Sequence, residues 1–148
     1  MFEALSFLRH FDEPALDWFF GHAVERNVTS GTVLIEEGRH PDAVFIVVQG
    51  LVGVRLASAG ATPVAQLGPG ELLGEISLLE NSPATATVTA AENTVLLTID
   101  RDVLRDRLDH NAEFAAQWYR AVALIQSRRL RERVMALTER VRSAAELP

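Results

Sequence analysis

The chain has 148 residues, a net charge of −6 and 48% apolar residues, which together indicate one soluble domain with a single core. It contains no cysteine, which excludes disulfides and thiolate metal sites. Its acidic balance argues against nucleic-acid binding.

The charge is unevenly distributed, because residues 1–100 carry 4 Arg and 13 acidic residues (−9), whereas residues 101–148 carry 10 Arg and 7 acidic residues (+3). Glu3 stands where a secretion signal needs positive charge. The longest apolar run, residues 43–48, is too short to cross a bilayer. We therefore expect a cytoplasmic chain without a membrane segment.

The first part of the chain, up to about residue 22, is predicted to be helical. Asp12 followed by Pro14 is a typical helix start, because aspartate caps free amides and proline suits the first turn. Dense apolar side chains predict a buried stripe here: Phe2, Leu5, Phe7, Leu8, Phe11, Leu16, Phe19 and Phe20.

Residues 25–98 have the pattern of strands and turns. Short β-prone runs are separated by turn signals such as Ser30-Gly31, Gln49-Gly50 and Pro69-Gly70. About eight such runs predict a mainly β fold, an eight-stranded jelly-roll sandwich with flanking helices.

Residues 100–142 are predicted to form two helices, capped by Asp100 and by Asn111. The second would have about 31 residues and a length of roughly 47 Å, more than a small β-domain spans. We therefore expect its far end to contact something else. The expected domain is residues 1–142, with a frayed tail over 143–148.

Signatures of catalysis are scarce. The chain has no G-x-S-x-G motif and no Walker loop, and GPGELLG at residues 68–74 is one residue too long for a dinucleotide fingerprint. The histidines at positions 10, 22, 40 and 110 lack metal-ligand spacing, so we predict no catalytic residue and no metal site. A cupin-like enzyme is the competing class, because jelly rolls of that type are often metal enzymes.

The order of helix, eight strands, short helix and long helix resembles the cyclic nucleotide-binding domain, over about residues 5–140. Residues 30–54 resemble the first half of that domain, with glycines at the family's spacing at Gly31, Gly38 and Gly50. LGPGELLGEISLLENSPATATV, residues 67–88, resembles its phosphate-binding cassette. The resemblance implies a regulatory fold of the catabolite-activator and protein-kinase-A regulatory-subunit type, with cAMP or cGMP as candidate ligands.

The resemblance also assigns roles to cassette residues. Gly74 would let the backbone approach the ligand, and Glu75 would accept a hydrogen bond from the ribose 2′-hydroxyl. The N-terminal amides of a short helix over residues 75–79 would face the cyclic phosphate. The expected ligand-binding set is Gly74, Glu75, Ile76, Ser77, Ala84 and Thr85.

One cassette position departs from the family pattern. The family reads Pro-Arg-x-Ala-Thr-Val, whereas this chain reads PATATV, so Ala84 stands where an arginine would pair with the phosphate. A hydrogen bond to a charged group is worth about 1.5–3 kcal/mol, so its loss weakens anion binding substantially.

Three interpretations follow from this departure. In the preferred one, the cassette is degenerate and the domain is a structural or interaction module. In the second, a cyclic nucleotide binds weakly or through a replacement cation, for which Arg39 and Arg55 are the only arginines between Gly31 and Asp100. In the third, another small ligand binds to the hydroxyls of Ser82, Thr85 and Thr87.

The last helix has two apolar segments. The first is expected to pack on the jelly roll or over its pocket: Phe114, Trp118, Ala121, Val122 and Ile125. Because the family closes this helix on the nucleotide base, Trp118 could be a base-stacking lid, although core packing is the favoured interpretation.

The second segment forms a short heptad seam that predicts a parallel homodimer: Leu130, Val134, Leu137 and Val141. The arginines beside it are interpreted as a solvated face, partly neutralised by Glu132 and Glu139: Arg128, Arg129, Arg131 and Arg133.

The family's bacterial transcription factors place a helix-turn-helix after this helix, and no such segment precedes Pro148. The sequence therefore predicts a non-enzymatic, dimeric interaction or sensor module with an Arg-less cassette and no DNA-binding domain. The alternative is a weak or non-standard cAMP or cGMP sensor that acts on a partner protein. No cofactor is predicted with certainty.

Overall fold

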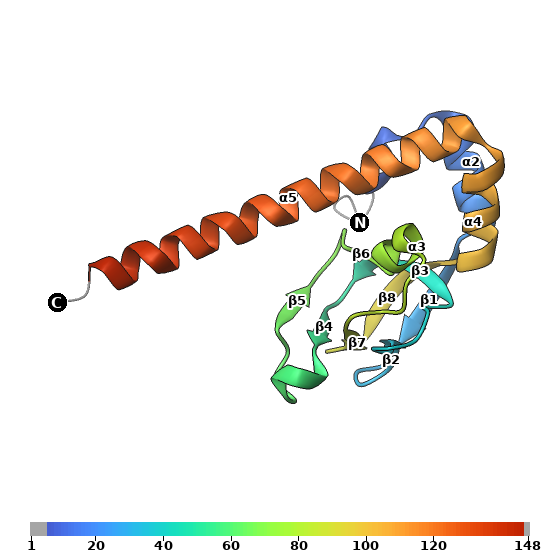
Figure 1. Cartoon of the computed structure of the whole chain (residues 1–148). Coiled ribbons are helices and arrows are strands. Elements are labelled where there is room, and N and C mark those ends of the chain that lie inside the picture. The colour runs from blue at the N-terminus through green and yellow to red at the C-terminus, as the bar shows by residue number, and fades with distance from the viewer. Residues whose placement is uncertain (1–5, 147–148) are drawn as a thin grey trace.

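The computed structural model describes residues 6–146 and confirms the predicted β-sandwich with flanking helices (Figure 1). The strands are β1 (Val24–Val28), β2 (Val33–Ile35), β3 (Ala43–Gln49), β4 (Val52–Arg55), β5 (Ala65–Leu67), β6 (Leu72–Leu73), β7 (Thr87–Ala90) and β8 (Thr94–Asp100). The helices are η1 (Ser6–His10), α2 (Glu13–His22), η2 (Ala57–Ala59), α3 (Glu75–Glu80), α4 (Arg101–His110) and α5 (Ala112–Ala145).

Two antiparallel four-stranded sheets form the sandwich, in the orders β1-β8-β3-β6 and β2-β7-β4-β5. The apolar run of β3 is explained by burial on both faces. Its alternate side chains Phe45 and Val47 pack between the sheets, whereas Val44 and Ile46 pack beneath the helices. A strand that is covered on both sides needs no polar alternation.

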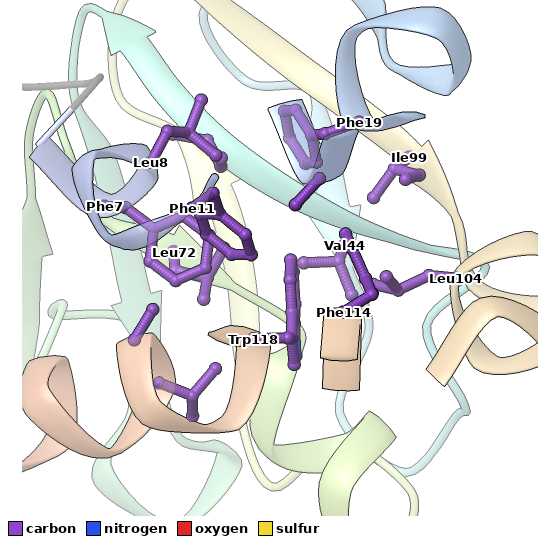
Figure 2. Packing of buried hydrophobic residues seen from close by; sticks show 14 of the residues in the cluster. Phe7, Leu8, Phe11, Phe19, Val44, Leu72, Ile99, Leu104, Phe114 and Trp118 are labelled. Carbon is purple, nitrogen blue, oxygen red and sulfur yellow. The ribbon is translucent and has the colours of Figure 1, made fainter. Parts of the chain in front are cut away.

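The helices form a second core on the outer face of the first sheet (Figure 2). The indole of Trp118 meets the ring of Phe7 edge-on at 5.2 Å, and Phe11 and Phe114 surround it. Such edge-to-face contacts add to the gain from burying aromatic area.

The predicted N-terminal stripe is only partly buried. Phe19 packs in the core, but Phe20 is 50% exposed, because neighbouring residues of a helix point in different directions. Phe2 and Leu5 lie outside the described residues.

The predicted helix starts are confirmed by their caps. The Asp12 carboxylate accepts from the amide of Ala15 at 2.9 Å, and the Asn111 side chain accepts from that of Phe114 at 2.8 Å. The Asp100 carboxylate accepts from two amides at the start of α4. Each cap satisfies amides that have no partner within the helix.

Helix α5 has 34 residues, which corresponds to about 51 Å, and it extends well beyond the β-domain (Figure 1). Its buried side chains all lie between Phe114 and Ile125. The helix continues past the expected end at Arg142 to Ala145, so residues 143–145 are helical rather than part of a tail. No glycine or proline interrupts this segment before Pro148, which is consistent with the longer helix.

Candidate functional site

The cassette surrounds a cavity of about 210 Å³ between β6, α3, the start of β7 and helix α5. The cavity is lined by every predicted ligand-binding residue: Gly74, Glu75, Ile76, Ser77, Ala84 and Thr85. Two α5 side chains, Arg129 and Arg133, also line it. A cassette predicted from one stretch of sequence therefore shares its cavity with residues about 50 positions further along the chain.

Gly74 occupies a position that only glycine fits well. Its φ is +86°, and a Cβ there would lie 2.9 Å from the carbonyl oxygen of Ala43. The residue precedes α3, so its left-handed backbone turns the chain from β6 into that helix.

Glu75 begins α3 and is only 4% exposed. Its Oε1 accepts hydrogen bonds from Nη1 of Arg129 at 2.9 Å and from Nε2 of Gln126 at 2.7 Å. Burial raises the pKa of this carboxyl, and the nearby Arg129 guanidinium opposes that rise. The predicted ribose acceptor is therefore already bonded to two donors from α5.

Arg129 connects α5 to the cassette through several bonds from one guanidinium. Its Nε donates to Oε2 of Glu71 at 3.0 Å, and its Nη2 donates to the same oxygen and to the carbonyl of Leu72 at 2.9 Å. Its side chain is 17% exposed. The prediction that this arginine belongs to a solvated face is wrong, because it forms a partly buried ion-pair cluster with Glu71 and Glu75.

Arg133 lies one helical turn beyond Arg129 and lines the same cavity. It is exposed, and no hydrogen bond or ion pair of its side chain is found within residues 6–146. Arg129 and Arg133 thus differ in their partners, although both face the cassette.

Helix α3 is also held by α4. Nη2 of Arg105 donates to the carbonyl of Leu78 at 2.7 Å, and Nη2 of Arg101 donates to Oδ1 of Asn81 at 3.0 Å. The short helix is therefore fixed by side chains of both C-terminal helices.

Ala84 is buried and packs among the apolar side chains between the two sheets. Its amide donates to the carbonyl of Arg39, and its carbonyl accepts from the amide of Gly38, both at 2.8 Å. These bonds hold the end of the cassette against the turn between β2 and β3, with the side chain at the cavity wall.

The two arginines proposed as replacement cations do not line the cassette cavity. The Nε of Arg39 lies 3.5 Å from Oε2 of Glu36 on the surface. Nη2 of Arg55 donates to Oγ1 of Thr89 at 3.2 Å. The arginines that line the cavity come instead from α5, at Arg129 and Arg133.

The hydroxyls of the third interpretation do not converge either. Thr85 lines the cavity, but Ser82 and Thr87 are not among its lining residues. Oγ1 of Thr87 instead accepts a hydrogen bond from the amide of Glu37 at 3.1 Å.

Trp118 is 1% exposed in the helical core and is not part of the cavity wall. In this arrangement it acts as a core side chain rather than as a lid. The seam residues lie further along α5 and are all exposed, between 54% and 64%: Leu130, Val134, Leu137 and Val141.

The arginine contact had a signal in the sequence. Trp118, Val122 and Ile125 follow the buried face of α5, and the next position on that face, four residues on, is Arg129. A charged residue where the apolar period calls for a core residue indicates a buried partner of opposite charge. Glu71 and Glu75 are those partners.

Over the part of the chain that the structure describes, no group of three or more histidine, cysteine, aspartate or glutamate side chains is placed to hold a metal ion. Within the same residues, no helix is both long and apolar enough to cross a membrane.

Comparison with known proteins shows what the chain is similar to. The family model of the cyclic nucleotide-binding domain matches residues 25–111. The chain is 40% identical to a cyclic nucleotide-gated potassium channel of Mesorhizobium japonicum over 74 residues, which is half of its length. The chain is 29% identical to the CRP-like cAMP-activated global transcriptional regulator of Mycobacterium tuberculosis over 103 residues, which is 68% of its length.

Among solved structures, a cyclic nucleotide-binding domain from Methylobacillus flagellatus superposes with a TM-score of 0.80 and 18% identity, over 93% of this chain and 82% of that one. At this identity the likeness shows the fold alone. The chain spans 19% of the channel and 44% of the transcriptional regulator, less than half of either relative's length.

Proposed function

The chain belongs to the cyclic nucleotide-binding domain family, and from this we propose that it is a non-enzymatic, dimeric regulatory module that binds cAMP or cGMP weakly. The observation that carries the proposal is the cassette cavity, which is lined by all the expected ligand-binding residues and by Arg129 and Arg133 of α5. A ligand in that cavity would touch both the β-sandwich and the helix that extends beyond it.

Weak binding follows from the charges that face the ligand. The resemblance places the phosphate-pairing arginine at Ala84, whose methyl group donates no hydrogen bond. An anion in the cavity therefore lacks a cation at position 84 of the cassette, and its desolvation is less well compensated. In addition, a ribose hydroxyl must share or displace the donors already on Oε1 of Glu75. We expect micromolar or poorer affinity.

The dimeric part of the proposal depends on the exposed seam of α5, which runs from Leu130 to Val141. Four apolar side chains spaced 4-3-4, on a helical segment that no other element of residues 6–146 covers, are typical of a coiled-coil interface. At about 100° per residue, the seam is centred roughly 110° around the helix from Arg129. A second copy could therefore pack on the seam without displacing Arg129 from the cassette.

A second candidate is an interaction module that binds no nucleotide. The specific observation in its favour is that Glu75, the expected ribose acceptor, already accepts from Arg129 and Gln126. In that case the ion pairs of Arg129 with Glu71 and Glu75 have a structural role only. The seam of α5 is then available to a partner whether or not a ligand is present.

Calorimetry with cAMP and cGMP separates the two candidates. We expect micromolar or weaker binding by the natural chain and about tenfold tighter binding by Ala84→Arg, because that variant places a cation in the cassette. Ala84→Met is the control of comparable length without charge. Binding by neither the natural chain nor Ala84→Arg would support the interaction module, and nanomolar binding by the natural chain would contradict the weak-affinity part.

A further inference from the structure

We propose that Arg133 of α5 supplies the cation for the phosphate of a bound cyclic nucleotide, in place of the arginine that the cassette lacks. The inference rests on the proposed function, because it names the side chain that pairs with the charged part of that ligand. It makes a helix residue, rather than a cassette residue, the determinant of anion affinity.

The first argument is position. Arg133 lines the cavity that Ala84 and Thr85 also line, and it does so from α5. Four residues separate it from Arg129, so both side chains leave the same face of α5, about 40° apart around the helix axis. The bonds of Arg129 to Glu71 and Glu75 hold this face against the cassette.

The second argument is charge. Among the residues that line the cavity, the charged ones are Glu75, Arg129 and Arg133. Arg129 is already committed to Glu71, Glu75 and the carbonyl of Leu72, so its charge is locally compensated. Arg133 has no such partner among residues 6–146, so its guanidinium remains available to pair with an anion in the cavity.

The third argument excludes the other arginines near the cassette. Arg39 pairs with Glu36, and Arg55 donates to Thr89. Nη2 of Arg128 lies 3.8 Å from Oε1 of Glu71, and Arg128 is not among the residues that line the cavity. Within the described part of the chain, Arg133 is thus the cation that combines access to the cavity with an uncommitted guanidinium.

The ligand class follows from this arrangement. A cyclic phosphodiester carries one negative charge with two exposed oxygens, which a guanidinium can bind through two parallel donors. Its sugar would lie toward Glu75 and its phosphate between Ala84 and Arg133. Binding would then tie the cassette to α5 at a second point, one turn beyond Arg129.

The test compares Arg133→Gln with the natural chain, using cAMP and cGMP in calorimetry at two salt concentrations. We expect Arg133→Gln to weaken binding roughly tenfold at low salt and to show a smaller loss of affinity between about 50 and 500 mM NaCl. Arg131→Gln is the matched control, an exposed arginine of the same helix that does not line the cavity, and it should bind as the natural chain does. Because Arg133 is exposed and unpaired, the thermal midpoint of its variant should not change.

Ala84→Arg sharpens the test. In that background the cassette again has its own cation, so Arg133→Gln should cost less than about twofold. Measurable binding by the natural chain with unchanged affinity and salt dependence in Arg133→Gln would overturn the inference and leave the proposed function standing. Absence of nucleotide binding by the natural chain would overturn both.

Discussion

The two halves of α5 carry similar apolar periods but have opposite surroundings. In the first half, Phe114, Trp118 and Ile125 are buried against the sandwich, whereas in the second half Leu130 and Leu137 are more than 60% exposed. The periodicity of a helix therefore shows that one face is to be covered but does not show what covers it. Arg129 and its two carboxylates mark the border between the halves.

We expect the largest effect on the free energy of unfolding from a substitution in the buried half of α5. Trp118→Ala should lower the free energy of unfolding by about 3–5 kcal/mol, because it leaves a cavity among packed aromatic rings. Leu137→Ala, in the exposed half, should change the unfolding of the β-domain by less than about 0.5 kcal/mol. Urea denaturation of both variants, monitored by fluorescence of the remaining tryptophan or by circular dichroism, measures the difference. Equal losses would show that both halves are covered to the same extent.

A substitution in the exposed half of α5 should change the oligomeric state rather than the stability of the β-domain. Leu137→Asp places a charge in the proposed seam and should weaken self-association at least about a hundredfold, which corresponds to about 2.7 kcal/mol. Light scattering should then find monomers in which the β-domain remains folded. Glu139→Asp is a control on the same segment. A natural chain that is monomeric at high micromolar concentration would refute the dimer.

A substitution at Arg129, on the border between the two halves of α5, should have an intermediate effect on the free energy of unfolding. Arg129→Met keeps the length of the side chain but leaves Glu75 buried without its cation, and we expect a loss of about 2 kcal/mol in unfolding free energy. The estimate is below that for a fully buried pair because Arg129 and Glu71 are partly exposed. In the double variant with Glu75→Gln, part of this loss should be recovered, and a strictly additive double variant would show that the two side chains are not coupled.

The smallest effect concerns pH. Burial raises the folded-state pKa of Glu75 above its ordinary 4.5, so the native state binds more protons than the unfolded state between those two values. The contribution of this carboxyl to stability is therefore complete below pH 4.5 and is lost as the pH rises through the folded-state pKa. Glu75→Gln removes this titration, so its unfolding free energy should fall less over that window. Parallel pH profiles for the two chains would contradict the shift.

The features that could be predicted from the sequence depend on short separations or on regular periods. The caps at Asp12 and Asn111 act on amides three residues away, and the apolar run of β3 directly reports a strand buried on both faces. The cassette glycine was predicted from the resemblance, and its left-handed backbone gives the physical reason.

The contacts that could not be predicted join distant segments. The apolar period of α5 indicates that Arg129 has a buried partner, but Arg129 and Glu75 are 54 residues apart, and no local pattern identifies Glu75 as that partner. Trp118 posed a different difficulty, because a core residue and a lid have the same helical spacing. Only the placement of η1, which brings Phe7 against the indole, distinguishes these roles.

The length of α5 beyond Arg129 gives the helix a mechanical property. About 24 Å of helix separates Arg129 from Ala145, so a tilt of about 10° at the ion-pair cluster would displace the far end by about 4 Å. That lateral displacement is about half of the roughly 8–10 Å that separates the axes of two packed helices, so it would alter how a partner fits against the far end. Helix α5 would thus act as a lever arm, in which a small rearrangement at Glu71 and Glu75 becomes a larger movement at Ala145.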